Sequence, residues 1–144
     1  MYGLLTMRRR AFVLVNRIMN VVVRLLRLRR FRGADLLLLT TTGRRSGQPR
    51  TTPLLYLSQQ NRWIVVASNA GADWEPGWWL NLRAGSSATV RIDGTSTRVT
   101  GTEITGAERD HMWQLLNEQV FNYNAYQAKV QRQIAVVALT PASS

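Results

Sequence analysis

From Gly33 onward the chain is a succession of short runs rich in β-forming residues, each closed by a turn signal, and this spacing restricts the fold more than any other property of the sequence. Asp93-Gly94 is a strong two-residue hairpin signal, and the polar stretch from Gly43 to Gly47 marks another turn. The predicted strands are 35–42, 50–57, 62–68, 87–93, 95–104 and 133–139. We therefore expect an α+β protein built on a small barrel of about six mostly antiparallel strands.

Three helical stretches interrupt these strands. A short helix opened near Pro76 is expected within 74–84. Thr105 precedes Glu108 by three residues, the spacing of a capping box, and predicts a helix that runs to about Gln119. A third, short helix carries Tyr123 and Tyr126, which then lie on one helical face.

Size and composition exclude several classes of protein. A chain of 144 residues is the size of one domain with an added element. It has no cysteine and a single histidine, His111, so disulfides, thiolate chemistry and multi-histidine metal sites are excluded, and no metal site is expected. The formal net charge of +11 favours an anionic partner. Any chemistry is then expected to reside in a bound cofactor.

The first 32 residues differ from the remainder, 33–144, and form a separate segment. From Ala11 to Arg30 the sequence has helical periodicity, with arginines and asparagines on one face and aliphatic residues on the other. No apolar run reaches the roughly 20 residues of a spanning helix, and no cleavage site for a signal peptide is present. Two interpretations remain: a helix lying on an anionic membrane surface, or one packed on the barrel or on a second subunit. The first places the protein in the cytoplasm, peripheral on the inner face of the cell membrane.

The segment from Thr40 to Arg50 concentrates arginines, hydroxyl groups and glycines in one turn. Glycines let backbone amides approach a phosphate, and arginines pair with its oxygens in bidentate fashion. The glycine and lysine spacing of the P-loop and the Rossmann glycine pattern are both missing. Taken alone, the turn is better explained as a solvated hairpin with edge-protecting charges than as a ligand-binding site.

A second segment combines small residues at 67–72 with the tryptophan-rich stretch 76–82. Backbone groups beside bulky indoles suit the polar edge and the face of a flat heteroaromatic ring. The alternative is that Trp78 and Trp79 are core residues.

These segments occur in a recognisable order: Leu-Thr-Thr-Thr-Gly-Arg-Arg-Ser-Gly-Gln-Pro-Arg, then Pro-Leu-Leu-Tyr, Val-Ala-Ser-Asn, Trp-Trp-Leu-Asn-Leu, and the two tyrosines. Over about 35–141 the chain resembles the deazaflavin-dependent nitroreductase family. The resemblance implies a split β-barrel, coenzyme F-420 as cofactor, and hydride transfer to an organic acceptor. The residues it assigns to the cofactor are Thr42, Arg44, Arg45, Ser46, Gly47, Gln48, Arg50, Val66, Ala67, Ser68, Asn69, Ala70, Trp78, Trp79 and Asn81.

The acceptor site is expected to involve Ser68, Tyr123 and Tyr126, through hydrogen bonding or proton supply. Family members often carry a further tyrosine where this chain has Val120, which favours a quinone over bicyclic nitroimidazoles. They also tend to show Asp-Arg-x-Ile-Pro before the last strand, whereas this chain has Gln-Arg-Gln-Ile-Ala over 131–135. Two alternatives stay open, a flavin-binding (FMN) split barrel and a basic nucleic-acid-binding barrel, although no nucleic-acid motif is found. The oligomeric state is left open.

Overall fold

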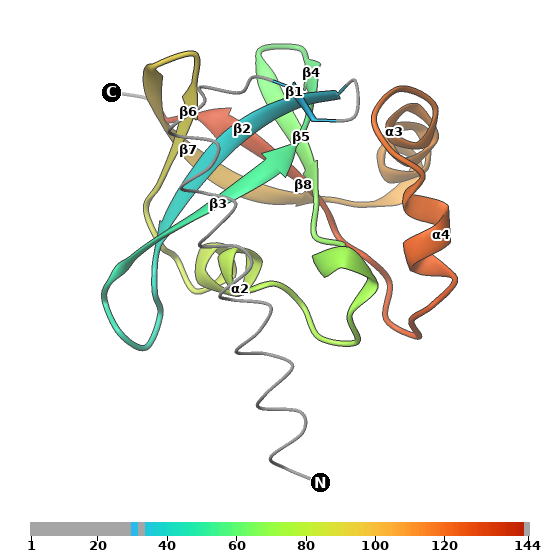
Figure 1. The fold of residues 1–144 in the computed structure, drawn as a ribbon, viewed down its shortest axis with the longest axis horizontal. Helices are drawn as coiled ribbons and strands as arrows, with labels where there is room; N and C mark the ends of the chain where they lie inside the picture. The colour runs from blue at the N-terminus through green and yellow to red at the C-terminus, as the bar shows by residue number, and fades with distance from the viewer. Residues whose placement is uncertain (1–29, 32–33, 143–144) are drawn as a thin grey trace, which may run out of the picture.

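The computed structural model describes residues 30–31 and 34–142. These form eight strands, a 3-10 turn and three helices (Figure 1). The strands are β1 (Arg30–Phe31), β2 (Ala34–Thr42), β3 (Pro49–Leu55), β4 (Leu57–Gln59), β5 (Arg62–Val66), β6 (Ala88–Ile92), β7 (Thr95–Ile104) and β8 (Val136–Pro141); the helical elements are η1 (Asn69–Gly71), α2 (Gly77–Arg83), α3 (Gly106–Gln119) and α4 (Tyr123–Gln127). The α+β class is confirmed. The predicted amphipathic helix lies outside the described residues.

The sheet curls into a barrel because one stretch of chain pairs with both of its edges. Strand order runs β1-β2-β6-β7-β8-β5-β4, and β3 pairs with β2, all antiparallel. Strands β3 and β4 are separated by Tyr56 alone, whose N–H donates to the carbonyl of Asp35 at 3.2 Å. The predicted strand 50–57 is thus one segment that changes partner at Tyr56. Counted this way, six strands form the barrel wall, which agrees with the split β-barrel expectation.

The last strand begins and ends later than predicted. The sequence favours 133–139, but β8 spans Val136–Pro141, because the Ile134 N–H donates to the Gln127 side chain instead of entering a ladder. At the other end, pairing with β5 stops at Leu139, so Pro141 pairs with β7 alone. A proline lacks the N–H that a second ladder would need, and it is tolerated there.

Helix α3 begins after Thr105 as predicted, but the capping box does not form. The Thr105 side chain makes no capping hydrogen bond. Glu108 instead accepts from the Arg62 guanidinium of β5 at 2.8 Å. The carboxylate that the pattern assigned to the helix end therefore ties α3 to the barrel wall.

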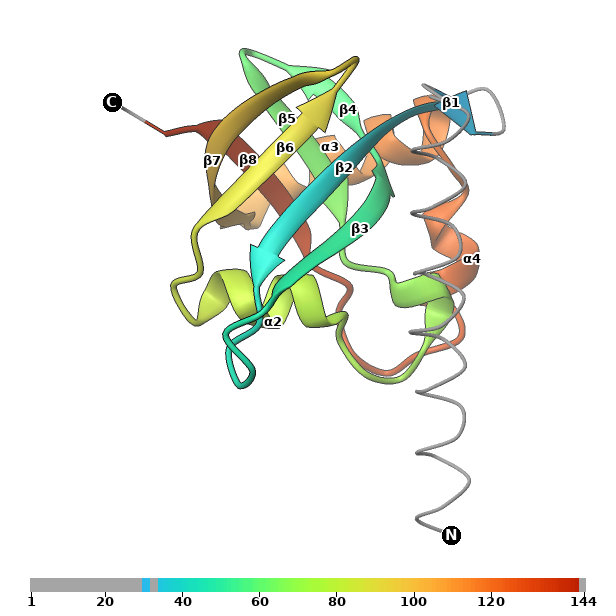
Figure 2. The ribbon, with the colours of Figure 1, turned by 60° about the vertical axis from the view of Figure 1, so that its left-hand side comes forward.

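Alternating residues of the wall face two separate clusters. Leu39, Val65 and Val137 point into the barrel and pack with α2. Ile64 and Val136, one position along the strands, pack outward against α3 and α4. In Figures 1 and 2, α2 lies across one end of the barrel, while α3 and α4 lie on its side. The end covered by α2 is where the loops of the candidate site gather.

Candidate functional site

The two segments that sequence analysis singled out lie at the same end of the barrel. Figures 1 and 2 both place the tip of the β2–β3 hairpin and the loop containing η1 there, on either side of α2. The first is called the hairpin tip (43–48) and the second the β5 loop (67–72). Two segments distant in the sequence are thus brought to one end of the barrel.

The hairpin tip is a tightly closed turn. The Gly43 N–H donates to the Gln48 carbonyl at 2.8 Å, and the Gly47 N–H donates to the Gly43 carbonyl at 2.9 Å. A Cβ on Gly43 would lie 2.5 Å from Ser46 Oγ, and Gly47 has φ +69°. Both positions therefore require glycine, one for space and the other for its backbone conformation.

Two arginines of this hairpin are free to bind a ligand. Arg45 and Arg50 are exposed, and neither makes a hydrogen bond or ion pair with another described residue. Thr42, Ser46 and Gln48 are also exposed beside them. The tip thus offers cationic and hydroxyl groups to solvent, as the sequence predicted.

Asn81 of α2 holds the hairpin in place. Its buried Oδ1 accepts from both the backbone N–H and the Nη1 of Arg44, each at 3.1 Å. Its Nδ2 donates to Thr41 Oγ1 at 3.0 Å. A second link joins the Thr42 N–H to Ser86 Oγ at 2.8 Å. Both ends of the Asn81 amide are hydrogen-bonded within the protein, so Asn81 positions Arg44 and the tip. Thr41 lies in the segment that sequence analysis singled out, whereas Ser86 lies outside it.

The β5 loop has an unusual backbone. Ser68 is right-handed, with φ −74° and ψ −30°, whereas Asn69, Ala70 and Gly71 have φ of +51°, +54° and +79°. A right-handed residue followed by a left-handed one turns successive N–H groups toward one point and forms an anion-binding nest. The N–H groups of Ser68, Asn69 and Ala70 make no hydrogen bond with another described residue. They are available to an oxygen of a ligand.

Few side chains of the β5 loop reach the surface. Val66, the last residue of β5, and Ala67 are buried in the two clusters. Asn69 is buried as well, and its Nδ2 donates to the Trp74 carbonyl at 2.9 Å, while its Oδ1 has no partner among the described residues. Ser68 is half-buried and Ala70 is exposed. The loop therefore presents mainly backbone, together with the Ser68 hydroxyl.

Both tryptophans of α2 belong to the barrel core. Trp78 and Trp79 are buried, with ring centroids 6.4 Å apart, and they pack among the aliphatic residues of the wall. The Trp79 Nε1 is buried without a partner among the described residues, and the Arg83 guanidinium lies 5.4 Å from the Trp79 ring centroid. Of the two readings of these indoles, the structure supports core packing.

The two tyrosines of α4 have different surroundings. Tyr123 is buried between Trp113 and Phe121, and burial, with a smaller contribution from Tyr126, raises the pKa of its phenol far above the usual value of 10.0. Tyr126 is half-buried and stacks on Phe121 with centroids 5.3 Å apart. A Cβ on Gly71 would lie 3.1 Å from the Tyr126 ring, so Tyr126 borders the β5 loop. Of the pair, Tyr126 is the one placed beside the candidate site.

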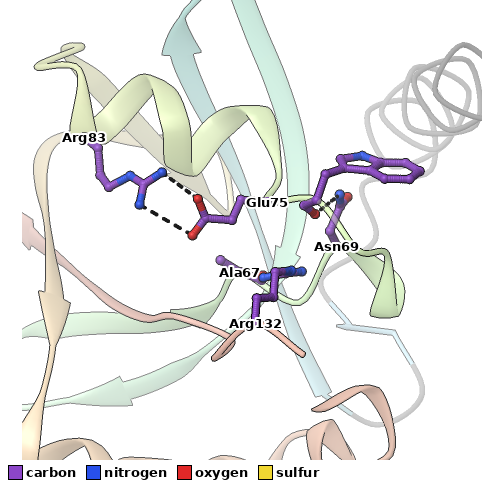
Figure 3. A network of polar contacts seen from close by, with 6 residues as sticks. Ala67, Asn69, Glu75, Arg83 and Arg132 are labelled. Carbon is purple, nitrogen blue, oxygen red and sulfur yellow. Dashed lines mark hydrogen bonds and ion pairs between the residues drawn. The ribbon is translucent and has the colours of Figure 1, made fainter. Parts of the chain in front are cut away.

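Arg132 contacts the β5 loop, and sequence analysis did not assign it to the site. Its guanidinium donates to the carbonyls of Ala67 at 3.2 Å, Ser68 at 3.0 Å and Ala72 at 3.1 Å. Figure 3 shows Arg132 beside Ala67. The only signal was its place in the motif Gln-Arg-Gln-Ile before the last strand. Two segments distant in sequence, the β5 loop and the loop before β8, meet at these contacts.

No group of three or more metal-ligating side chains occurs within the described ranges. His111 lies exposed on α3, on the side of the barrel. The chemistry that the described residues offer is therefore oxygen binding by amides and arginines, with Ser68 and Tyr126 as the nearest hydroxyl groups.

Comparison with known proteins identifies similar chains. A family model described as F420H(2)-dependent quinone reductase matches residues 10–141. An F420H(2)-dependent quinone reductase of Mycobacterium tuberculosis is 37% identical over 107 residues, which cover 72% of each chain. Among solved structures, an F420-H2 dependent reductase has 33% identity and a TM-score of 0.65, covering 75% of this chain and 94% of its own. A structure described as a domain-swapped dimer has 28% identity and a TM-score of 0.66, covering 87% of this chain and 98% of its own.

Proposed function

Since the chain belongs to the F420H(2)-dependent quinone reductase family, we propose that it is an oxidoreductase that transfers a hydride from reduced F-420 to a hydrophobic acceptor, a quinone in particular. The observation that carries the proposal is that two groups lie at one end of the barrel: the side chains of Arg45 and Arg50, and the amide nest of residues 68–70. Neither group has a hydrogen-bond partner among the described residues. The first suits the anionic tail of this coenzyme, and the second suits the carbonyl edge of its ring.

The hairpin tip fits a phosphate and carboxylate tail. Among the described residues, the side chains of Arg45 and Arg50 have no hydrogen-bond or ion-pair partner, and Asn81 holds Arg44 by two hydrogen bonds. Arginine forks bind such oxygens in bidentate fashion, and the amides of a glycine-bearing turn approach them closely. Ser46, Gly47 and Gln48 complete the turn that would hold the tail, with the Thr42 hydroxyl at its base.

The β5 loop fits the ring. The N–H groups of Ser68, Asn69 and Ala70 would donate to a ring carbonyl, while Val66 and Ala67 fix the loop from the core side. Trp78 and Trp79 would support the site from within the barrel. When bound, reduced F-420 supplies the hydride, and the contribution of the protein is to orient the two reactants and exclude water.

The acceptor is proposed to bind against Tyr126 and Ser68, whose hydroxyl groups can hydrogen-bond an acceptor oxygen. Tyr123 supports Tyr126 through Phe121, on which both rings pack. Val120, which packs against the same cluster, contributes an aliphatic side chain at the position where members of the resembled family often carry a tyrosine. An aliphatic wall favours a quinone over a nitroimidazole.

Binding of F-420 is tested by fluorescence titration of the purified protein. Replacing Arg45 and Arg50 together with alanine should weaken binding, since each charged contact contributes roughly 1.5–3 kcal/mol. Equal affinity of wild type and Arg45→Ala/Arg50→Ala would reject the hairpin tip as the tail site. The absorption spectrum of bound ligand distinguishes deazaflavin from FMN and from nucleic acid, the two rival partners.

The choice of acceptor is tested by steady-state rates with reduced F-420. We expect measurable reduction of a quinone and weak turnover of a bicyclic nitroimidazole. A nitroimidazole turned over as fast as every quinone tested would reverse the assignment.

We further propose that residues 1–32 attach the protein to an anionic membrane surface, which would bring it close to lipid-soluble quinones and place it at the inner face of the cell membrane. The amphipathic pattern of 11–30 supports this. Within the described residues, no helix is long and apolar enough to cross a bilayer.

A further inference from the structure

The guanidinium of Arg132 contacts the β5 loop from the side opposite its free amides. Its Nη1 and Nη2 donate to the carbonyls of Ala67 and Ser68, and its Nε and Nη2 both donate to the carbonyl of Ala72. One planar group thus spans the entry and the exit of the loop. A carbonyl held in this way fixes the plane of its whole peptide unit, because the peptide is rigid.

Two of the three nest amides belong to these same peptide units. The Ala67 carbonyl shares its peptide with the Ser68 N–H, and the Ser68 carbonyl shares its peptide with the Asn69 N–H. Hydrogen bonds in a chain polarise one another, so a cation on the carbonyl side strengthens the N–H as a donor on the other side. Arg132 therefore both orients these amides and increases their affinity for an oxygen.

The loop needs such support because its backbone is strained. Asn69 and Ala70 both have positive φ, which non-glycine residues rarely adopt. Such conformations persist where the surroundings determine them. Within the loop, the Gly71 N–H donates to the Ser68 carbonyl and the Ala72 N–H to the Asn69 carbonyl, each at 3.0 Å, and the Asn69 side chain donates to the Trp74 carbonyl at 2.9 Å. Arg132 adds hydrogen bonds from a different segment of the chain to the carbonyls of Ala67, Ser68 and Ala72.

Arg132 is itself held in position. Gln127 of α4 donates from Nε2 to the Arg132 carbonyl at 2.7 Å and accepts from the Ile134 N–H at 2.9 Å. The Arg109 guanidinium donates to the Ile134 carbonyl at 2.7 Å. Because α4 also carries Tyr126, the hydrogen bonds of Gln127 connect the helix that borders the proposed acceptor site, through Arg132, to the β5 loop.

We propose that Arg132 is a positioning residue that holds the amide nest of residues 68–70 in the conformation that binds the carbonyl edge of the deazaflavin ring, and that this requires its planar fork. The proposal rests on the F-420 function proposed above. Its electrostatic setting is consistent: burial lowers the pKa of Arg132, and the nearby carboxylates of Glu75 and Asp73 oppose that shift, so the group stays charged.

The test compares Arg132→Lys with Arg62→Lys in the full-length protein. Both arginines are half-buried and hydrogen-bonded, but Arg62 donates to the Glu108 carboxylate of α3, on the side of the barrel. The probes are F-420 and its riboside, which has the ring but lacks the phosphate and glutamate tail. A lysine keeps the charge, yet its single nitrogen cannot span three carbonyls.

For Arg132→Lys we expect both probes to bind about tenfold more weakly, with KM for F-420 raised and KM for the quinone unchanged; tenfold corresponds to about 1.4 kcal/mol. Arg62→Lys should bind both as wild type does. The matched variant Arg45→Ala/Arg50→Ala should weaken F-420 and leave the riboside unaffected. Arg132→Gln serves as a second variant if the lysine does not fold, and the same loss is expected.

Riboside affinity equal to wild type in the folded Arg132 variants would overturn the proposal, as would an equal loss in Arg62→Lys. A wild-type protein that binds neither probe would instead reject the F-420 function itself. The two failures are therefore distinguished within one experiment.

Discussion

At the scale of single residues, the amide of Asn81 decides whether the hairpin tip is held against the barrel. Replacing it with alanine removes the acceptor for the Arg44 N–H and the donor to Thr41, which is buried. Unsatisfied buried groups cost about 1–3 kcal/mol. We expect Asn81→Ala to lower the free energy of unfolding by that amount and to weaken F-420 binding, as measured by urea denaturation and by fluorescence titration.

The matched control is Asn117→Ala. Asn117 also uses both ends of its amide, donating to the Trp113 carbonyl at 2.8 Å and accepting from the Asn124 N–H at 2.8 Å, but it lies between α3 and α4. It should destabilise the protein without changing the affinity for F-420. Unchanged affinity in Asn81→Ala as well would mean that the tip keeps its conformation without this anchor.

The sequence predicts the exposed members of the site better than its supports. Glycines, hydroxyls and arginines in one turn mark the hairpin tip because each contributes a recognisable phosphate contact. The nest could not be predicted in this way, since Ala70 is a residue type that normally avoids positive φ. Arg132 was missed for a related reason: its partners are backbone carbonyls, which leave no trace in a residue pattern.

At the scale of elements, α2 can cover the end of the barrel because β7 has no side chain where the two meet. A Cβ on Gly101 would lie 2.8 Å from Leu82 Cδ1 and 3.3 Å from Cδ2, and Leu82 is buried in the core. Overpacking of this kind costs typically 1–3 kcal/mol. We expect Gly101→Ala to lower the midpoint of urea denaturation accordingly.

Gly77→Ala is the control, because a Cβ at this first position of α2 meets nothing within 4 Å and alanine favours a helix. It should be neutral or slightly stabilising. The double variant Gly101→Ala/Leu82→Ala should lose less free energy of unfolding than the sum of the two single variants, because truncating Leu82 removes the atoms with which the new Cβ clashes. Strict additivity would show that the two residues do not press on one another.

The positions of the helices and strands are predicted well from the sequence, whereas their ends are predicted poorly. The hairpin at Asp93-Gly94 and the start of α3 are where the pattern predicts them, since turn residues and periodicity are local signals. The break between β3 and β4 at Tyr56 and the extension of β8 to Pro141 depend on which strands pair with these segments, and barrel closure determines that pairing. Glu108 pairs with Arg62 instead of the helix end for the same reason.

At the scale of the whole molecule, charge is divided very unevenly along the chain. Nine of the nineteen basic residues precede Gly33, and all eight acidic residues follow it. The barrel segment therefore has nearly balanced charge, and the net charge of +11 derives mostly from the N-terminal segment. This distribution argues against a nucleic-acid-binding barrel and for an anionic surface that is met by residues 1–32.

A charge-matched pair of variants tests that surface in the full-length chain. Each basic residue near an anionic bilayer contributes about 1 kcal/mol, so Arg24→Gln/Arg27→Gln should bind anionic vesicles roughly 30-fold more weakly than wild type. Arg91→Gln/Arg98→Gln removes the same charge from exposed positions on β6 and β7 and should sediment with vesicles as wild type does. Binding should also fall as salt shortens the Debye length from about 10 Å at 0.1 M. Equal losses in the two variants would show that net charge alone attracts the protein. If the wild-type chain does not bind anionic vesicles at low salt, the membrane-surface proposal is rejected, and packing of residues 1–32 on protein becomes the remaining interpretation.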